Sequence, residues 1–399
     1  MSRALDIDHF DIDGEAYDDK SGTSVDLSAD GTILAIGAPE NGHWNTGRFH
    51  SGHVRVYQFS DGSWTQLGTD IDGDQDYQYS GRCVSLSSDG VFLAVGAYGA
   101  SSRGRVRVYQ FAGGSWSQIG STINGNADNE QFGWVVSLNS DGTILAVGAN
   151  GANERGAARV YQRYASSPST WSLRNGVSGE AQWDTFGHSI TLSSDGQILA
   201  VGGINNDGGG TNSGHVRTFY AGWNYAQFGG DIDGPHTNAM SGQAVSLNGD
   251  GTKLAVGAFF ASSAGGSTGH VRVYQRTGYS WTQMGEDIDG GGPNDYFGYS
   301  VDLSSDGTIL AVGAKTKGSQ WAADKPGYVR VYEWSTRGYT SWWNQIGEIH
   351  GEAEKDEFGR SVSLSANGTI LAVGAPYNDG AGNNAGHVRV YQRLGGSIW

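Results

Sequence analysis

The residues best suited to bind a ligand lie in the segments that differ most from one part of the chain to another. Aromatic and basic side chains gather there: Trp44, Arg48, Phe49, Tyr98, Phe259, Phe260, Lys317, Trp321 and Tyr377. Aromatic rings can stack on sugar rings or anchor a protein interface, and Arg48 and Lys317 would add polar contacts. The alternative is that these rings pack locally over the rim of the fold.

Signatures of an enzyme are weak in this sequence. It contains no phosphate-binding loop and no His-x-x-x-His pair. We therefore expect a non-catalytic binding or adhesion module that recognises a glycan or a protein. Two alternatives stay open: a polysaccharide lyase or hydrolase with catalytic groups from scattered loops, such as His50 or Tyr98, and a purely structural repeat domain.

A repeated unit must position these segments. The stretch SVDLSADGTILAIGA at residues 24–38 recurs with small changes, giving seven units of about 55 residues. Segments such as SVSLS and ILAVG alternate like strands, and the Asp-Gly pair between them is a strong hairpin signal. HVRVYQ and WTQLG predict a third and a fourth strand. Each unit is expected to form four antiparallel strands.

Seven such units predict an all-β fold, a seven-bladed β-propeller; a solenoid, the alternative, would need polar end caps. The sequence opens on LDIDHFDIDG, which reads as the tail of a fourth strand, and its last residues reach only the start of one. We expect the N-terminal strand to complete the last blade and close the ring. The expected single domain 1–399 has blades at 15–73, 74–125, 126–179, 180–234, 235–290, 291–351, and 352–399 together with 1–14.

The two sides of this ring differ in sequence. The spacing from Leu27 to Gly37 is the same in all seven units, which makes the turns between the first two strands uniform. The loops between strands two and three vary in length, and they leave the sheet at the same end as the loops between blades. Because variable loops on a fixed scaffold commonly carry function, we expect the ligand at this loop-rich face.

Two polar columns recur in the third strands. We expect the arginines to form structural ion pairs and the histidines to be structural, since residues from separate blades cannot converge on one metal ion. The arginines are Arg55, Arg107, Arg159, Arg217, Arg272, Arg330 and Arg389, and the histidines are His53, His215, His270 and His387.

The motifs that flank the first two strands resemble FG-GAP repeats, as in the integrin alpha-subunit propeller and related bacterial and algal surface proteins. Phe132-Gly133 and Phe358-Gly359 carry the first half, and Gly37-Ala38-Pro39 carries the second half in full. The resemblance implies a propeller at the cell surface or outside the cell, as one domain of a larger protein. One departure is that turns such as SSDG are too short for the calcium loops of integrin-type repeats, so we expect no metal and no cofactor.

The net charge restricts the possible binding partners, and the cysteine count restricts the possible disulfides. The net charge of -16 and the pI near 4.9 disfavour nucleic acid and anionic membranes as partners, and the chain has no apolar run long enough to insert into a membrane. We expect a monomeric domain. The single cysteine, Cys83, excludes an internal disulfide and is expected to be a small buried residue.

Overall fold

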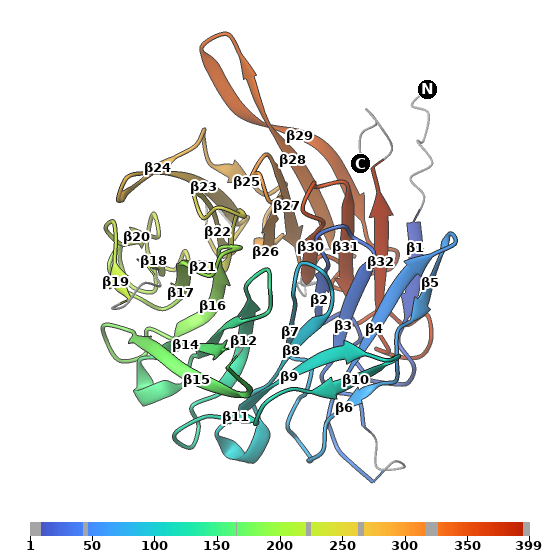
Figure 1. The fold of residues 1–399 in the computed structure, drawn as a ribbon. Helices are drawn as coiled ribbons and strands as arrows, with labels where there is room; N and C mark the ends of the chain where they lie inside the picture. The colour runs from blue at the N-terminus through green and yellow to red at the C-terminus, as the bar shows by residue number, and fades with distance from the viewer. Residues whose placement is uncertain are drawn as a thin grey trace, which may run out of the picture.

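The computed structural model describes residues 9–42, 47–164, 166–220, 225–261, 267–315 and 326–393. Seven antiparallel sheets stand around a central axis, which confirms the seven-bladed propeller (Figure 1). In the described segments, no helix has the length and apolar character needed to cross a membrane. Among the described residues, two short 3-10 helices, Ala100–Ser102 and Ala152–Glu154, lie in loops between second and third strands.

The first four blades follow one another along the chain, and within each blade the strands run in order from the inner to the outer one. Blade one has β2 (Ser24–Leu27), β3 (Ile33–Ala38), β4 (His53–Ser60), β5 (Ser63–Gln66) and β6 (Ile71–Asp72). Blade two has β7 (Cys83–Leu86), β8 (Phe92–Ala97), β9 (Arg105–Ala112), β10 (Ser115–Gln118) and β11 (Ile123–Asn124). Blade three has β12 (Phe132–Leu138), β13 (Ile144–Ala149), β14 (Ala157–Tyr164) and β15 (Ser167–Ser178). Blade four has β16 (Phe186–Leu192), β17 (Ile198–Gly203), β18 (His215–Tyr220), β19 (Ala226–Gln227) and β20 (Ile232–Asp233).

The last three blades repeat this order. Blade five has β21 (Ser241–Leu247), β22 (Lys253–Ala258), β23 (His270–Thr277), β24 (Ser280–Gln283) and β25 (Ile288–Asp289). Blade six has β26 (Phe297–Leu303), β27 (Ile309–Ala314), β28 (Tyr328–Arg337) and β29 (Thr340–His350). Blade seven has β30 (Ser361–Leu364), β31 (Ile370–Ala375), β32 (His387–Gln392) and β1 (His9–Asp13). The short strands β6, β11, β20 and β25 continue an interrupted fourth strand along the third.

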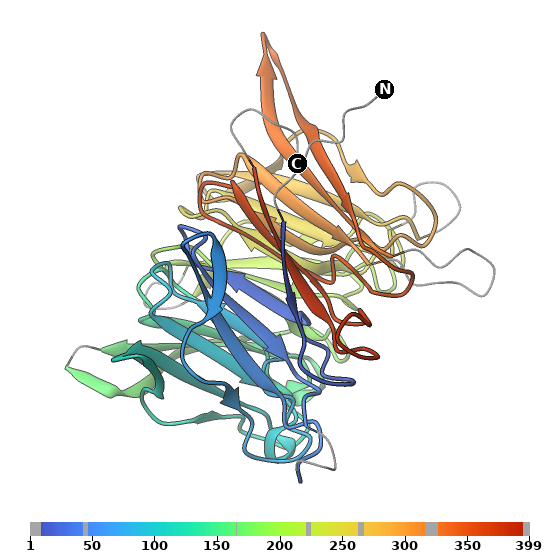
Figure 2. The same cartoon turned by 90° about the vertical axis from the view of Figure 1, so that its right-hand side faces the viewer.

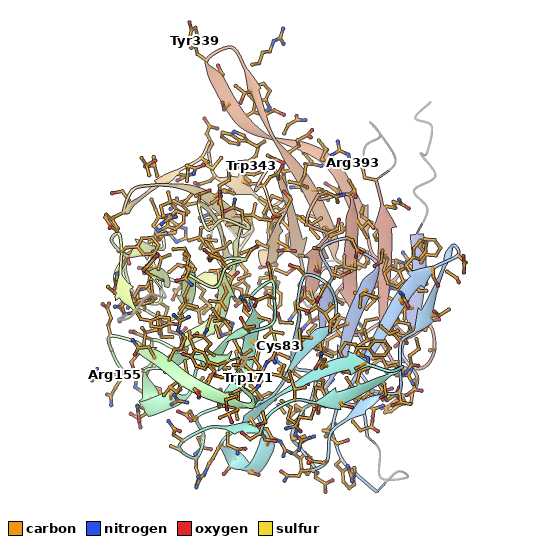
Figure 3. The ribbon with its side chains drawn as sticks, viewed as in Figure 1. Cys83, Arg155, Trp171, Tyr339, Trp343 and Arg393 are labelled. Carbon is orange, nitrogen blue, oxygen red and sulfur yellow. The ribbon has the colours of Figure 1, made fainter. Side chains whose placement is uncertain are left out.

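The ring closes as the sequence predicts. Strand β1 pairs antiparallel with β32, with His9 opposite Tyr391 and Asp13 opposite His387. The N-terminal strand therefore supplies the outer strand of blade seven. The β28–β29 hairpin extends beyond the other blades, and Tyr339 at its tip is fully exposed (Figures 1, 2 and 3).

The paired Phe-Gly and Gly-Ala motifs form the contact between blades. The phenylalanines Phe132, Phe186, Phe297 and Phe358 are fully buried. Gly257 of one blade lies against the carbonyl of Gly298 of the next, so closely that a β-carbon on Gly257 would overlap that oxygen. Gly298 itself has φ +84, a conformation that favours glycine. Both halves of the motif are thus explained by close packing of neighbouring blades.

The inner strands of the seven blades surround a central channel. Two rings of hydrogen bonds join the blades at one end of this channel, where the tight turns lie. In the first, the turns bond in sequence through their backbones, from Ala29 to Ser88, Ser140, Ser194, Gly249, Ser305, Ala366 and back to Ala29. In the second, a leucine N–H of each inner strand donates to a side-chain oxygen of the preceding blade, at 2.6–3.4 Å. The acceptors are Asp26, Ser85, Ser137, Thr191, Ser246, Asp302 and Ser363. We call this second set the inner acceptor ring.

The column of arginines is structural, as predicted. Arg272 binds Asp287 at 2.8 Å, Arg330 binds Glu348 at 2.7 Å, and Arg389 binds Asp11 at 2.9 Å. Arg107 pairs with Asp74, and Arg159 pairs with Glu130. The remaining members of the column are held in the same way, Arg55 by Asp70 and Arg217 by Asp231. Acidic residues near the ends of the fourth strands therefore neutralise the positive charges of the arginines in the third strands.

Candidate ligand site at the loop-rich mouth of the channel

The loop-rich end of the channel is lined by residues that differ from blade to blade. Each follows the glycine of a Phe-Gly motif or its Ser-Gly counterpart and faces a hollow of about 240 Å³. We call these residues the mouth ring: Thr23, Arg82, Trp134, His188, Gln243, Tyr299 and Arg360. Cys83, beside Arg82, lines the same hollow near the centre of the ring of blades (Figure 3).

A second hollow of about 190 Å³ extends from the mouth toward the loops of blades one, two and seven. Thr23, Arg82, Trp134 and Arg360 line both hollows. The residues that line only the second are Lys20, Pro39, Glu40, Tyr79, Tyr98 and Tyr377. The two spaces therefore form one funnel, whose walls combine aromatic rings with charged groups.

Aromatic side chains lead from the rim into this funnel. Neighbouring ring centroids are 5.1–6.0 Å apart, and the Phe49–Tyr77, His50–Tyr79 and Tyr79–Tyr98 pairs are stacked. In order from the rim, this aromatic arc consists of Phe49, Tyr77, His50, Tyr79, Tyr98, Trp134 and His188. Tyr77 is exposed, whereas Tyr79, Tyr98 and Trp134 are half-buried, so the rings keep part of their surface open to solvent.

Cations gather at the funnel. Arg82 lies 4.2 Å above the ring of Trp134, and Lys315 lies 4.5 Å above that of Tyr299. Glu357 binds both Arg360, at 2.7 Å, and Lys315, at 3.2 Å. Lys20 binds Asp18 at 2.7 Å and lies 4.1 Å above the ring of Tyr377.

These cations change the titration of their neighbours. Burial alone would raise the pKa of Tyr299, but the positive charges of Arg360, Lys315 and Arg82 outweigh it and lower the pKa below its usual value. Burial, together with the charge of Arg82, lowers the pKa of His188 to about 4. The imidazole of His188 is therefore neutral at pH 7, and the cations of the funnel lower the pKa of both Tyr299 and His188 although the protein as a whole is acidic.

The predicted ligand residues fall into several places. Phe49 and Tyr98 belong to the aromatic arc, and Tyr377 lines the second hollow. Phe259 and Phe260 pack against each other and against Tyr296, with ring centroids 4.5–5.9 Å apart, and Phe259 also meets the edge of Tyr299 of the mouth ring at 5.6 Å. The contacts of Phe259 and Phe260 correspond to the alternative stated for the predicted ligand residues, in which aromatic rings pack against their neighbours.

Of the two predicted polar anchors, Arg48 is described, and it does not line either hollow. Arg48 donates to the carbonyl of Gly73 at 2.6 Å, a contact that ties a loop of blade one. Trp44, Lys317 and Trp321 lie outside the described residues.

The predicted ligand residues include no member of the mouth ring. Arg82, Trp134, His188 and Tyr299 stand at the start of the repeated stretch, where we expected architecture alone. A signal was present, because the residue after each Phe-Gly or Ser-Gly pair differs between copies while the residues around it recur. A comparison of the seven copies position by position would have found it.

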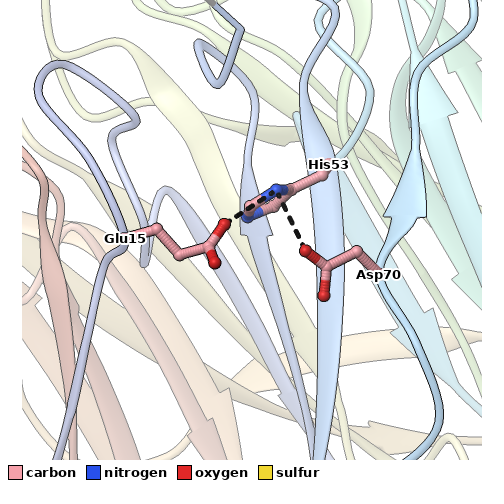
Figure 4. A group of neighbouring side chains, drawn as sticks. All are labelled: Glu15, His53 and Asp70. Carbon is pink, nitrogen blue, oxygen red and sulfur yellow. Dashed lines mark ion pairs between the residues drawn. The ribbon is translucent and has the colours of Figure 1, made fainter. Parts of the chain in front are cut away.

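Two groups of side chains bring donor atoms for a metal ion together in the described part of the chain. In one, the Nδ1 atom of His53 lies 4.0 Å from oxygens of Glu15 and Asp70 (Figure 4). Both carboxylates are already paired with Arg55, so a cation would have to compete with that guanidinium. The other group, Glu180, His215 and Asp231, surrounds Arg217 in the same way. We assign both groups to the structural arginine column.

Comparison with known proteins agrees with this architecture. Residues 344–391, which run from β29 to β32, match the family model described as FG-GAP repeat. The chain is a seven-bladed β-propeller that contains an FG-GAP repeat. No curated protein matches this propeller. A similar solved structure is that of a protein from Bacteroides uniformis described as a candidate 6-phosphogluconolactonase, with 12% identity and a TM-score of 0.61 over 87% of this chain and 89% of that chain. At that identity the likeness concerns the fold alone.

Proposed function

We propose that the propeller is a non-catalytic module that binds a glycan at the loop-rich mouth of its channel. The aromatic arc carries this proposal, because its rings run from the rim to the channel and remain partly exposed. The apolar faces of sugar rings pack well on such aromatic faces, and the polar groups between the rings can bind sugar hydroxyls. A location outside the cell or at its surface, where polysaccharides occur, is part of the proposal.

A glycan suits this site better than a protein surface does. A stable protein interface covers roughly 800 Å² on each partner and is centred on a few exposed anchors. The funnel is instead concave, with hollows of about 240 and 190 Å³, and most of its rings are set back from the surface. A chain end or a short stretch of sugar units can enter such a space.

The test begins with a glycan array and continues with calorimetry on the glycans that bind. Tyr98→Ala and Trp134→Ala remove two neighbouring rings of the arc and should weaken binding about tenfold or more. Tyr339→Ala is the matched control, because that ring is fully exposed at the tip of the β28–β29 hairpin. The proposal is wrong if the Tyr98 and Trp134 variants bind as tightly as the Tyr339 variant.

Two other functions would give different results in the same experiment. A polysaccharide-degrading enzyme would release shorter products during incubation, so the bound glycan is recovered and its length measured; we expect it to be intact. A purely structural domain would bind no glycan on the array, and the wild-type protein would then behave like both arc variants.

A further inference from the structure

Arg82 differs from the other arginines around the channel. The arginine column of the third strands is held by acidic partners, and Arg360 in the mouth ring is held by Glu357. The backbone N–H of Arg82 donates to the carbonyl of Tyr79 at 3.1 Å. Its side chain has no hydrogen bond or ion pair with any residue in the described part of the chain, and the guanidinium rests on the ring of Trp134. A half-buried guanidinium in this state keeps its five N–H donors available to a ligand.

The carboxylates around the funnel are mostly committed to other cations. Glu357 holds both Arg360 and Lys315, and Asp18 holds Lys20. Glu40 also lines the second hollow, and burial raises the pKa of its carboxyl above the usual value. Arg82 is thus left with a positive charge that no neighbouring carboxylate binds, in a protein with a net charge of -16.

An aromatic wall stands next to this free charge. Trp134 contacts Arg82 on one side, Tyr98 at 5.1 Å between ring centroids, and His188 at 5.8 Å. A sugar ring that stacks on this wall would bring a charged substituent within reach of the guanidinium. Guanidinium groups bind carboxylates and sulfates through two parallel hydrogen bonds, which fixes the orientation of the group as well as its charge.

We propose that Arg82 anchors an anionic group carried by a sugar, a uronic acid carboxylate or a sulfate ester, at the mouth of the channel. This inference rests on the proposed function and adds to it the charge of the glycan. Trp134 has two roles here, since it supports the guanidinium and offers its remaining surface to the sugar ring.

The decisive experiment compares glycans that differ only in charge. We would titrate the protein with a trisaccharide of galacturonic acid and with its methyl ester, and in a second arm with dextran sulfate and dextran. Arg82→Gln should weaken binding of the charged member of a pair about ten- to a hundredfold and leave the neutral member unchanged. Arg82→Lys keeps the charge but not the paired donors, so it should recover part of the loss. Arg103→Gln, an exposed loop arginine paired with Asp128, is the control for net charge.

Substitution of Glu40 gives an independent variant with the opposite expected effect on binding of the charged glycan. Its carboxylate lines the same hollow and repels an anion, so Glu40→Gln should strengthen binding of the charged trisaccharide severalfold without affecting the methyl ester. If Arg82→Gln does not fold like the wild type, as judged by cooperative unfolding, the Glu40→Gln variant still tests the proposal.

The outcomes separate this inference from the proposed function. Loss of charged-glycan binding in Arg82→Gln, with normal binding in Arg103→Gln, supports the inference, and the arm that shows the loss identifies carboxylate or sulfate. If charged and neutral glycans bind equally and Tyr98→Ala weakens both, the glycan module stands and the anion pocket is wrong. If the wild type binds no glycan of either kind, both proposals are wrong.

Discussion

The two ends of the channel are formed by the same seven inner strands, yet the blades agree at one end and differ at the other. At the turn end, every blade uses the same backbone ring and the inner acceptor ring. At the mouth, the seven equivalent positions carry seven side chains of six types, including two arginines, a tryptophan and a histidine. The turn end must keep seven blades in register, whereas the mouth is free of that constraint.

This contrast separates repeated from variable positions along single strands. In β21, Gln243 belongs to the mouth ring and Ser246 to the inner acceptor ring, only three positions further on. Within three residues, an inner strand therefore passes from a position whose residue type varies between blades to a position whose hydrogen bond recurs in every blade. Substitutions at the two ends should differ correspondingly in their effect on stability.

The largest effect is expected where two blades meet through glycine. Gly257→Ala would place a methyl group onto the carbonyl oxygen of Gly298, and both partners are backbone that cannot rotate away. We expect the free energy of unfolding to fall by about 3 kcal/mol or more, measured by urea denaturation. Gly230→Ala is the control, since nothing lies within 4 Å of a β-carbon there. Equal stability of the two variants would refute the blade-contact role of the motif.

A smaller, pH-dependent effect is expected at the two aspartates of the inner acceptor ring. Burial, with a contribution from Asp302, raises the pKa of Asp26 from 3.8 to about 7, and burial raises that of Asp302 to about 6. Because these values are raised in the folded protein, their contribution to stability is full below about pH 4 and is lost as the pH rises through 6 and 7. Serine or threonine fills the same role in the other five blades.

The double variant Asp26→Ser with Asp302→Ser should therefore be more stable than the wild type at pH 8, by about 1 kcal/mol or more, and should lose this advantage at pH 4. Urea denaturation of both proteins at several pH values measures the difference. Buried histidines such as His188 and His270, whose pKa values are lowered to about 4 by burial, titrate equally in both proteins and cancel. A difference that does not change with pH would contradict the assignment.

A third effect concerns the tight turns. Asp306 accepts hydrogen bonds from the Ser304 hydroxyl at 2.7 Å and from Thr308 at 2.8 and 2.9 Å, and in blade seven Asn367 accepts the equivalent three. Asp306→Ala should lower the free energy of unfolding by about 1 kcal/mol, and Asp306→Asn should change it much less.

The same two variants differ in their response to acid. Burial would raise the pKa of Asp306, but the hydrogen bonds from Ser304 and Thr308 outweigh it and lower the pKa. The stability that this carboxylate adds is present above its usual pKa and is lost as the pH falls below it. Thermal unfolding between pH 3 and 7 should show that Asp306→Asn removes this part of the acid sensitivity; unchanged sensitivity would argue against the turn assignment.

The sequence was informative wherever the blades repeat. Seven copies of one unit predicted the strands, the hairpins and the structural arginines, and the incomplete units at the two ends of the sequence predicted that β1 would close blade seven. The acidic partner of each arginine was not predictable, because Asp74 and Glu130 reach their arginines only after the blades are packed side by side. The funnel was missed for a similar reason: Arg82 and Tyr98 belong to blade two, Trp134 to blade three and Tyr377 to blade seven, and only the ring brings them together.

The smallest effect is expected at the mouth, and it tests the contrast within a single strand. The Ser246 hydroxyl accepts from the Leu303 N–H at 3.1 Å and bonds to Asp302 at 2.9 Å, so Ser246→Ala should cost about 1 kcal/mol. Gln243 lines an open hollow, where its amide contacts His188, and Gln243→Ala should change stability by no more than about 0.5 kcal/mol. Urea denaturation of the two variants gives the comparison directly. If Gln243→Ala proved as costly as Ser246→Ala, the mouth would be part of the architecture, and the variety of its seven residues would no longer point to a binding site.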